Sequence, residues 1–255
     1  MKTSNKLLLI AMLVIAVLII SALVFIRVSF DNEAIEKKSC FWKRVVGDGN
    51  IIEKTFDVKN FDKLNIIGGF EVSLTQDTFY SVTIITDSNV MDLVDVEIKN
   101  DELIVKRKKG ARKTVFKADI VFKNLNTIKM TAGVILKTTS AIKVDDLSVY
   151  GNAGTVLSID GIFDKMVLDV NAGAVVNLSG KANILKINSN AGCLIDAVNM
   201  ETTNCDIESN AGCKIDVFVT DKLSVDANAG SSISYLGNPE IRNINLSSGS
   251  ILKQR

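Results

Sequence analysis

The 255-residue chain contains no histidine, one proline and few aromatic residues, which make up 6% of it. Without histidine it cannot build a Ser-His or Cys-His nucleophile, a histidine metal site or an imidazole acid or base. A single proline among 16 glycines argues against a proline-rich linker. Neither sign of charge is in excess, because the chain has 30 basic and 29 acidic residues. The net charge of +1 excludes nucleic-acid binding driven by overall charge, so we expect no nucleic-acid partner.

One long hydrophobic run is present near the start of the chain. Residues 7–26 are apolar except for Ser21. At about 1.5 Å per residue a helix of this length spans about 30 Å, the thickness of the bilayer hydrocarbon. The run is longer than the core of a cleavable signal peptide, and the first cysteine after it, Cys40, is too distant for a lipoprotein signal. We therefore predict an uncleaved transmembrane helix that makes the membrane a partner of residues 7–26.

The charges around this run predict its orientation. Lys2 and Lys6 precede it, whereas acids and bases are mixed after it, so the positive-inside bias places the N-terminus in the cytoplasm. The rest of the chain is then extracytoplasmic, either periplasmic or on the cell surface. We divide the sequence into a signal-anchor segment at residues 1–28, a juxtamembrane linker at residues 29–49 and one domain at residues 50–255.

The domain contains an internal repeat. Thr-Ala-Gly at 131–133 is followed by Asn-Ala-Gly at 152–154, 171–173, 190–192, 210–212 and 228–230, and then by Ser-Ser-Gly at 247–249. Successive glycines are 21, 19, 19, 20, 18 and 19 residues apart. A period this short, repeated this often, is typical of stacked solenoid coils.

Each repeat alternates between apolar and polar residues. Apolar or small residues stand one, three and five places before the asparagine, as in Leu185, Ile187 and Ser189, and the same parity continues in Ala191, Cys193, Ile195 and Ala197. A period of two indicates strands rather than helices. The drift in spacing also disfavours a left-handed helix built on strict six-residue units. We predict an all-β, right-handed parallel β-helix with rungs of about 19 residues, the glycine allowing the bend between sheets.

The segment before the repeats is also β-rich. Leu64, Ile66, Gly68, Phe70, Val72 and Leu74 alternate as in a degenerate rung. Asn100-Asp101 stands between two apolar segments and predicts a hairpin turn. A hairpin or cap at this end would cover the open edge of the solenoid.

Three segments carry a resemblance to a known family. They are Phe-Asp-Lys-Leu-Asn-Ile at 61–66 with Gly-Gly-Phe-Glu-Val-Ser-Leu-Thr-Gln at 68–76, Asn-Asp-Glu-Leu-Ile-Val at 100–105, and the Asn-Ala-Gly rungs. Together they resemble the putative auto-transporter adhesin head GIN domain family of Bacteroidetes-type bacteria, over about residues 55 to 250. The resemblance implies a right-handed β-helix displayed outside the cytoplasm and brings no catalytic residues. Members of the family often carry lipoprotein or cleavable signals, from which the predicted anchor departs.

The repeated turn is the first candidate site. Its asparagines and glycines are expected to stack into one ladder, and they are Asn152, Gly154, Asn171, Gly173, Asn190, Gly192, Asn210, Gly212, Asn228 and Gly230. Amides stacked at one corner can hydrogen-bond along the axis. We interpret this ladder as structural, with a glycan-binding role as the alternative.

Two surfaces are candidates for partner binding. Ile135, Val156, Val175 and Leu194 stand four places after the asparagine position and are expected to form an outward apolar stripe for a partner or a second copy, unless a loop covers it or the parity slips. The second surface is basic and consists of Lys106, Arg107, Lys108, Lys109, Arg112 and Lys113. It suits an anionic partner such as lipid headgroups or acidic glycans, unless it is a solvated hairpin end.

Carboxylates and cysteines complete the candidates. Asp169, Glu208 and Asp226 form one expected outward column, and Asp196 and Asp216 another; they would serve a solvated face, a calcium site or an acid/base pair. Cys193 and Cys213 hold the same inward position in successive coils, and Cys205 faces inward from the opposite strand. We interpret the cysteines as small core residues, and we expect no metal and no cofactor.

Three functions remain open from the sequence. The first is a membrane-anchored, extracytoplasmic, non-enzymatic module for adhesion, scaffolding or envelope interaction, with a glycan or an envelope protein as partner. The second is a carbohydrate-active β-helix enzyme such as a polysaccharide lyase or hydrolase. The third is a self-assembling filament, which would be a homo-oligomer.

Overall fold

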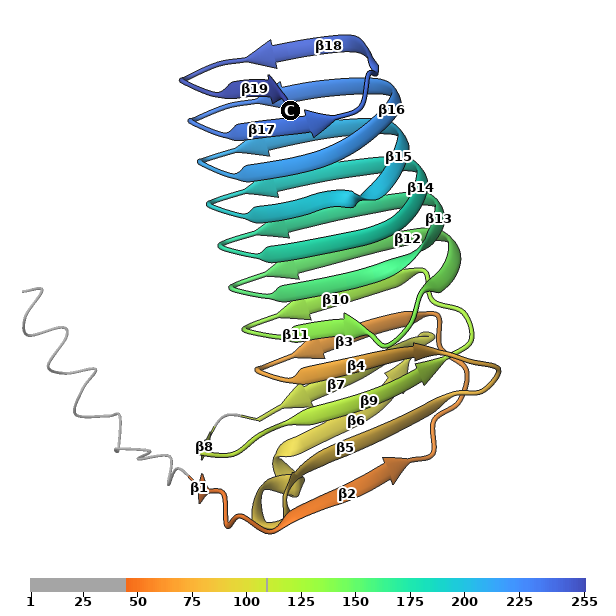
Figure 1. Cartoon of the computed structure of the whole chain (residues 1–255). Coiled ribbons are helices and arrows are strands. Elements are labelled where there is room, and N and C mark those ends of the chain that lie inside the picture. Colours follow the sequence, from red (N-terminus) through yellow and green to blue (C-terminus); the bar gives the residue numbers. More distant parts are fainter. Residues whose placement is uncertain (1–44, 109) are drawn as a thin grey trace, which may run out of the picture. The chain divides into compact units, whose positions relative to one another are not determined.

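The computed structural model describes residues 45–108 and 110–255 (Figure 1). These residues form an all-β solenoid of about seven stacked turns, with 69% of residues in strands and 3% in helix. The predicted transmembrane helix at residues 7–26 lies outside the described residues, as does the predicted linker up to residue 44. Within the described ranges, no helix is both long and apolar enough to cross a bilayer. The compact unit begins at Val45, so the last residues assigned to the linker belong to it.

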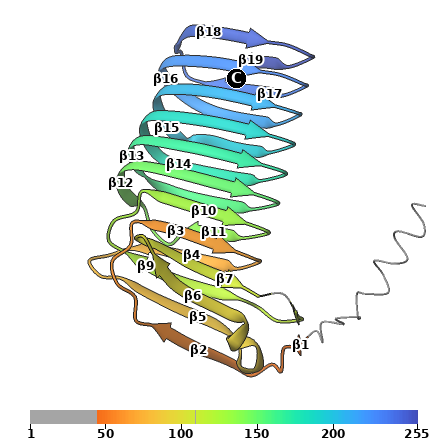
Figure 2. The same ribbon diagram turned by 180° about the vertical axis from the view of Figure 1, so that it is seen from behind.

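Five strands build the regular part of the stack. They are β12 (Ile142–Asn152), β13 (Val156–Asn171), β14 (Val175–Asn190), β15 (Leu194–Asn210) and β16 (Lys214–Ala227). From β13 onward, each runs along one sheet, curves through a wide bend and returns along the second sheet to the next tight turn (Figures 1 and 2). Neighbouring coils pair in parallel and in register, for example Val156 with Val175 and Asn171 with Asn190. This confirms the predicted parallel solenoid, whereas its right-handed winding stays a prediction.

The apolar positions of each coil point inward. Leu185, Ile187 and Cys193 are 0% exposed and Ile195 is 2% exposed. The alternation changes phase in the wide bend, between the buried Ala182 and Leu185. It is also interrupted at the tight turn, where Ala191, which we expected inside, is exposed. It lies within the tight turn with φ of 59°, and the inward parity resumes at Cys193.

The first coils are stacked out of sequence order. β3 (Lys63–Ile67) and β4 (Glu71–Gln76) form one coil, β7 (Glu102–Arg107) and β9 (Lys117–Phe122) a second, and β10 (Thr127–Thr131) and β11 (Ile135–Thr138) a third. β3 pairs with both β7 and β10, and β4 with both β9 and β11. The earliest coil is therefore held between two later ones, as Figure 1 shows. The predicted rung at 64–74 exists, but it is not the end of the stack.

Antiparallel strands cap this end of the solenoid. β5 (Ser81–Asp87) pairs antiparallel with β9 and with β2 (Ile51–Phe56), and β6 (Val94–Lys99) pairs antiparallel with β7. The β6–β7 turn at Asn100-Asp101 has two positive φ angles, 51° and 60°, as the hairpin prediction requires. The short 3-10 helix η1 (Ser88–Leu93) and the pair of β1 (Val45–Val46) and β8 (Ala111–Arg112) complete the cap.

The opposite end of the stack has no such cover. It consists of β17 (Ser232–Leu236), β18 (Glu240–Leu246) and β19 (Ile251–Gln254). Among the strands that the structure describes, β18 is in register with β16 and β19 with β17. The two ends of the solenoid therefore differ in kind.

Candidate functional site

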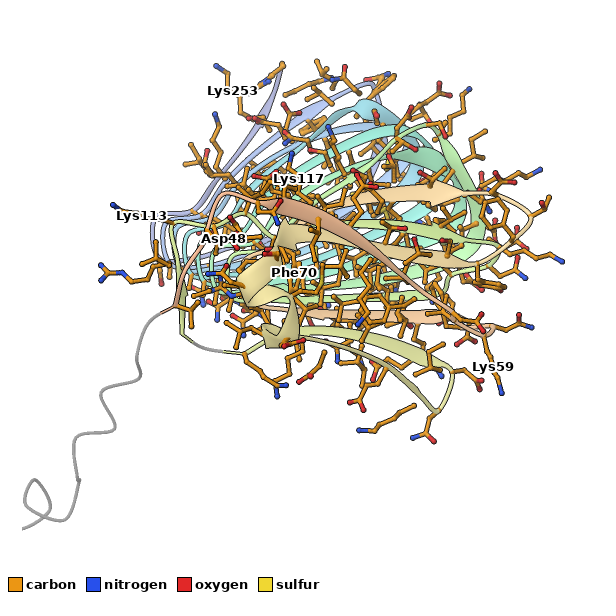
Figure 3. The ribbon with its side chains drawn as sticks, turned by 90° about the horizontal axis from the view of Figure 1, so that it is seen from below. Asp48, Lys59, Phe70, Lys113, Lys117 and Lys253 are labelled. Carbon is orange, nitrogen blue, oxygen red and sulfur yellow. The ribbon has the colours of Figure 1, made fainter. Side chains whose placement is uncertain are left out.

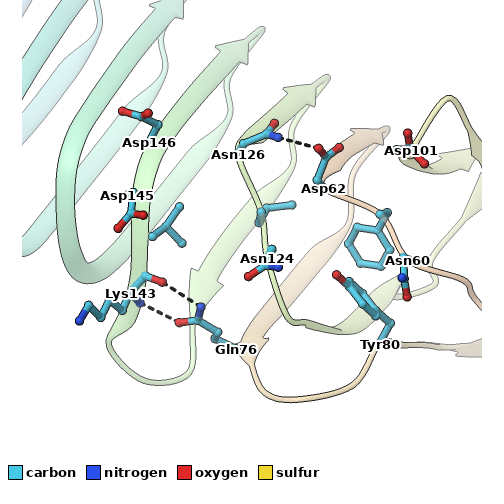
Figure 4. Close-up of a pocket in the computed structure, with 13 residues that line it drawn as sticks. Asn60, Asp62, Gln76, Tyr80, Asp101, Asn124, Asn126, Lys143, Asp145 and Asp146 are labelled. Atoms are coloured by element: carbon cyan, nitrogen blue, oxygen red, sulfur yellow. Dashed lines mark hydrogen bonds between the residues drawn. The ribbon is translucent and has the colours of Figure 1, made fainter.

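A pocket opens where the chain skips over a coil. The segment between β9 and β10 must climb past the β3–β4 coil, so residues 123–126 cross its side at the wide-bend edge. The resulting cavity, here called the crossover pocket, has a volume of about 650 Å³ (Figure 4). It is lined by Asn60, Phe61, Asp62, Gln76, Tyr80, Asp101, Asn124, Leu125, Asn126, Lys143, Val144, Asp145 and Asp146.

The lining is rich in carboxylates and side-chain amides. It contains four aspartates, four amide side chains and one lysine. Asn60, Asn124, Asp145 and Asp146 are exposed. One oxygen of Asp62 accepts a 2.8 Å hydrogen bond from Asn126, while its other oxygen, Oδ1, is buried without a hydrogen-bond partner among the described residues. The pocket therefore presents hydrogen-bond acceptors and donors close together.

Gln76 holds the pocket in shape. Its Oε1 accepts a 2.7 Å bond from the backbone N–H of Lys143, and its Nε2 donates to the Lys143 carbonyl at 2.9 Å. The same amide nitrogen donates to the Lys123 carbonyl at 3.3 Å. One side chain from the end of β4 thus ties the crossover segment to β12, which fixes two walls of the cavity.

An aromatic pair forms another wall. Phe61 is 1% exposed, and its ring centroid lies 5.0 Å from that of the half-buried Tyr80 in a tilted arrangement. Phe61 and the buried Leu125 anchor the segments on both sides of the skipped coil in the core. Because Phe61 supports its ring, Tyr80 presents an aromatic surface at the pocket on a rigid base.

A second polar column follows the wide bend. Asp145 is in register with Asp164, and Asn183 in the next coil donates to Asp164 at 2.7 Å. The sequence repeats an amide or carboxylate at this position, just before the strand that leads to each turn. Asp145 also lines the crossover pocket, so this column reaches the pocket.

The chemistry of the pocket suits recognition of hydroxyl groups. Carboxylate and amide oxygens accept hydrogen bonds from hydroxyls, amide nitrogens donate to them, and an aromatic ring packs against the apolar face of a sugar. Within residues 45–108 and 110–255 no group of three or more acidic or cysteine side chains is arranged to hold a metal ion. The pocket therefore offers hydrogen bonding and stacking.

The repeated turn is held together by its backbone. Ala153, Ala172, Ala191, Ala211 and Ala229 have φ between 54° and 59°, and the glycine after each is also positive. In this conformation the Gly173 N–H donates to Ala191 at 3.0 Å and the Gly192 N–H to Ala211 at 2.9 Å. A backbone ladder therefore connects the stacked turns. Among the asparagine side chains, that of Asn171 donates to Asp169 in its own coil, and that of Asn228 accepts a 2.7 Å bond from Ser247 at the same position of the next coil. The candidate residues of this ladder lie together at one edge; Asn171 is half-buried and Asn152, Asn190, Asn210 and Asn228 are exposed.

The cysteines are buried beside these turns. Cys193 and Cys213 each donate a 3.1 Å hydrogen bond to the carbonyl of the asparagine three residues earlier, as Ser231 does at 3.0 Å. All three described cysteines are free. Burial raises the pKa of the Cys193 thiol, and burial raises that of Cys205 far above the usual range. These thiols therefore act as small polar core groups rather than nucleophiles.

The structure brings the apolar stripe into one column. Ile135 pairs with Val156, Val156 with Val175, and Val175 with Leu194. Ile135 is 45% and Leu194 is 50% exposed, and the column ends at Glu71 on one side and Lys214 on the other. The parity does not slip, and no described loop covers these residues.

The basic residues are less concentrated than the sequence suggested. Lys108 pairs with Asp95 at 2.8 Å, and the Arg107 guanidinium lies 5.1 Å from the Phe116 ring centroid. Lys106, Arg112 and Lys113 are exposed, while Lys109 lies outside the described residues. Figure 3 shows Lys113 at the rim of the capped end and Phe70 near its middle. The free charge of this surface is thus carried by three described side chains.

The acidic columns are also in register. Asp169, Asn188, Glu208 and Asp226 stack in successive coils, and Asp196 stacks on Asp216. Asp216 is 9% exposed and accepts a 2.8 Å bond from Arg255, with Lys214 at 3.8 Å. The Asp196–Asp216 column is therefore partly neutralised by neighbouring bases.

The pocket residues were missed by the sequence analysis. The signal that marks them is a polar-apolar-polar pattern before the strand in two early coils, Asn60-Phe61-Asp62 and Asn124-Leu125-Asn126. These two segments come together only because the chain skips a coil, and no local sequence pattern predicts that skip.

Comparisons with known proteins agree with this architecture. The family described as "Putative auto-transporter adhesin, head GIN domain" matches residues 60–239. A search of curated proteins found no match.

Solved structures share the fold. A putative adhesin from Bacteroides fragilis NCTC 9343 is 21% identical, with a TM-score of 0.70, and the match covers 82% of this chain and 98% of that one. A putative adhesin from Parabacteroides merdae ATCC 43184 is 18% identical, with a TM-score of 0.66 over 83% and 98%. A putative lipid binding protein from Parabacteroides distasonis ATCC 8503 is 17% identical, with a TM-score of 0.64 over 84% and 100%. At these identities the likeness concerns the fold alone, but the family match spans most of the sequence. The chain therefore belongs to the auto-transporter adhesin head GIN domain family.

Proposed function

We propose that this protein is a membrane-anchored, extracytoplasmic and non-enzymatic adhesion module that binds a glycan in the crossover pocket. The observation that carries the proposal is the pocket itself, a cavity of about 650 Å³ lined by acids, amides and an aromatic side chain. Membership of an adhesin family supports the adhesive role. The apolar run at residues 7–26 supports the anchor.

The chemistry of the lining favours a sugar over an apolar ligand. Eight of the thirteen lining residues carry a carboxylate or an amide. A hydrocarbon ligand would leave these groups without water or partners, which costs free energy for each of them. A polyhydroxylated ligand replaces the lost water with hydroxyl groups, and the Tyr80 ring provides the stacking surface. The pocket is lined by four aspartates and by one base, Lys143, so it repels an acidic sugar. A neutral or amino sugar therefore fits better.

The binding test uses the full chain in detergent micelles. Retention is measured on an array of neutral, amino and acidic glycans, followed by titration of the retained glycan. We expect a neutral or amino glycan to bind the wild type, and Tyr80→Ala and Asp145→Asn each to weaken binding by at least about tenfold, the loss of one good contact. Asp196→Asn, an exposed acid on the opposite part of the solenoid, is the matched control and should leave affinity unchanged.

Other results would overturn the proposal in specific ways. If no glycan is retained, or if Tyr80→Ala binds as well as the wild type, the pocket is not the site. If a retained glycan is shortened during incubation, and Asp145→Asn stops this, the protein is an enzyme. If retention follows glycan acidity and is lost in Arg112→Ala, the basic surface is the binding site instead.

Placement outside the cytoplasm has its own test. Protease is added to intact spheroplasts or protoplasts, and the domain is followed by immunoblotting. The proposal expects digestion of the domain while a cytoplasmic marker stays intact. Full protection together with fractionation into the cytosol would reverse the proposed topology.

A further inference from the structure

A second hollow lies on the sheet whose strands begin at the crossover pocket. It has a volume of about 540 Å³ and is lined from β3, β10, β12 and β13, close to the tight turns. Tyr150, which is 43% exposed, is the aromatic residue of its lining. Of the residues that the structure describes, none lines both this hollow, here called the turn-edge hollow, and the crossover pocket.

The chemistry of the turn-edge hollow matches that of the crossover pocket. Its polar groups include the side chains of Asn65, Asn152, Asn171, Asp169 and Lys129. Asn171 donates a 3.2 Å hydrogen bond to Asp169, which holds these two side chains together at one side of the hollow. Hydrogen-bond donors and acceptors around one exposed ring suit a polyhydroxylated ligand.

The outward face between the two cavities carries short side chains. Along β12, Asp146 lines the crossover pocket, Tyr150 lines the turn-edge hollow, and Ser148 lies between them on the same face. Thr127 of β10 is in register with Ser148, and both are half-buried. These hydroxyl side chains form the floor of a polar trough that joins the cavities. At a rise of about 3.3 Å per residue, the path from Asp146 to Tyr150 is about 13 Å long.

Lys129 leans away from this trough. Its ammonium lies 2.9 Å from a carboxylate oxygen of Glu102. Glu102 belongs to β7, and β3 lies between β7 and the β10 strand that carries Lys129 (Figure 1). Because the lysine side chain reaches across β3, it forms a wall beside Asn65 and leaves the space over Thr127 and Ser148 open.

We propose that the crossover pocket and the turn-edge hollow are two subsites for one oligosaccharide, which lies along the sheet with its sugars between Tyr80 and Tyr150. This assignment rests on the proposed function and deepens it, since it makes the ligand a chain of several sugars. A path of about 13 Å is longer than one sugar ring, so only a chain reaches both cavities. Sugars in the middle bond to the hydroxyls of Thr127 and Ser148, and a sugar at the turn edge packs on Tyr150.

A continuous chain gains affinity over separate sugars. Once its first sugars occupy the crossover pocket, the following sugars are held beside Tyr150, so their binding becomes intramolecular. The charge of the turn-edge hollow selects the same kind of sugar. Because Glu102 pairs with Lys129, the carboxylate of Asp169 is left to oppose an acidic sugar there.

Oligomers of increasing length test the two-subsite assignment. Chitin, chitosan and mannan oligosaccharides, each from the single sugar to the hexamer, are titrated into the full chain in detergent micelles by isothermal calorimetry. For a series that binds, we expect one hexamer per chain and an affinity at least about tenfold above that of the single sugar. An affinity that does not depend on length, or two short oligomers bound independently per chain, would overturn the assignment.

Variants locate the second subsite. Tyr150→Ala should weaken binding of the hexamer by at least about tenfold and leave binding of the single sugar unchanged, whereas Tyr80→Ala should weaken both. Tyr150→Phe keeps the ring and should retain most of the affinity. Asn188→Ala is the control, because Asn188 is exposed in the same outward column two coils further along and lines neither cavity. Tyr150→Ala should melt like the wild type, since its side chain is exposed.

The same variants separate this assignment from the proposed function. If Tyr150→Ala binds the hexamer as the wild type does while Tyr80→Ala does not, the second subsite is wrong and the proposed function stands. If no oligomer binds at any length, or if Tyr80→Ala binds every length as the wild type does, the proposed function fails and the two-subsite assignment fails with it.

Discussion

The regular coils from β12 onward and the first coils beside the cap have the same alternation of buried and exposed residues, but the chain passes through them in different orders. In the regular coils the chain rises one rung per circuit, so every turn and bend stacks on a copy of itself. In the first coils the chain leaves the β3–β4 rung, builds the cap and returns above it. The regular part is therefore a closed column, while the irregular part is where loops cross and the crossover pocket forms. Repetition supplies rigidity, and its interruption supplies the candidate site.

The largest test of this comparison concerns the inward parity of the regular coils. Ile195→Asp buries a carboxylate without a partner at a position that is 2% exposed, and it should destabilise the fold by more than about 4 kcal/mol. Leu194→Asp, one residue earlier and 50% exposed, should cost less than about 1 kcal/mol. Thermal unfolding followed by circular dichroism measures both. Equal melting of Ile195→Asp and the wild type would show that the assigned parity is wrong.

A smaller effect separates the two edges of a regular coil. At Gly180, in the wide bend, an added Cβ would lie 2.0 Å from the Gly161 carbonyl oxygen, and φ is +105°. At Gly173, in the tight turn, nothing lies within 4 Å and φ is +75°. Gly173→Ala should therefore cost only the left-handed conformation, about 1–2 kcal/mol, and Gly180→Ala about 2 kcal/mol more because the coils must separate. Urea unfolding measures the free energy of unfolding of both variants. Equal losses of this free energy in the two variants would contradict the prediction.

Substitutions in the pocket wall should destabilise the fold less than substitutions inside the coils. Tyr80 is half-buried and packs mainly on Phe61, so Tyr80→Ala should cost about 1 kcal/mol of stability while weakening ligand binding. Tyr80→Phe keeps the ring and should restore most of both. If Tyr80→Ala unfolds the protein as Ile195→Asp does, the pocket is part of the core rather than a site built upon it.

The smallest effect lies at the base of the cap. The Ser88 hydroxyl donates a 2.6 Å bond to Asp48 and, with the backbone N–H of Asn50, holds the pKa of that carboxyl below its usual range. Because the folded-state pKa is lowered, this contribution to stability is present above about pH 4, the ordinary value for aspartate, and is lost as the pH falls through the folded-state pKa. Ser88→Ala should therefore melt at a slightly lower temperature than the wild type at neutral pH, and this difference should shrink as the pH falls below the ordinary aspartate value of about 4. A difference that stayed constant with pH would exclude this cause.

The sequence predicted the regular coils well because their pattern is local. The alternation that ends in Leu185, Ile187 and Ser189 requires strands with one buried side, and the spacing of the glycines sets the length of a coil. The Asn100-Asp101 hairpin followed from turn chemistry in the same way. Each of these features depends on a few neighbouring residues.

The order of the first coils and the crossover pocket depend on contacts between distant segments. An apolar rung such as Leu64–Ile66–Phe70 fits equally well between any two others, so alternation cannot say which rungs it joins. The positive φ of the turn alanines was missed for a related reason. Alanine has no local preference for that conformation, and the backbone bonds between stacked turns offset its cost. Such features become visible only when the coils are assembled.

Hydrogen–deuterium exchange of the full chain, with and without the glycan retained on the array, tests the link between the interrupted repeat and ligand binding most directly. The account predicts that the ligand slows exchange at residues 60–62, 76–80, 124–126 and 143–146, with little change in β13 to β16. Protection along Ile135, Val156, Val175 and Leu194, with none at the crossover, would contradict it and move the binding site to the apolar stripe.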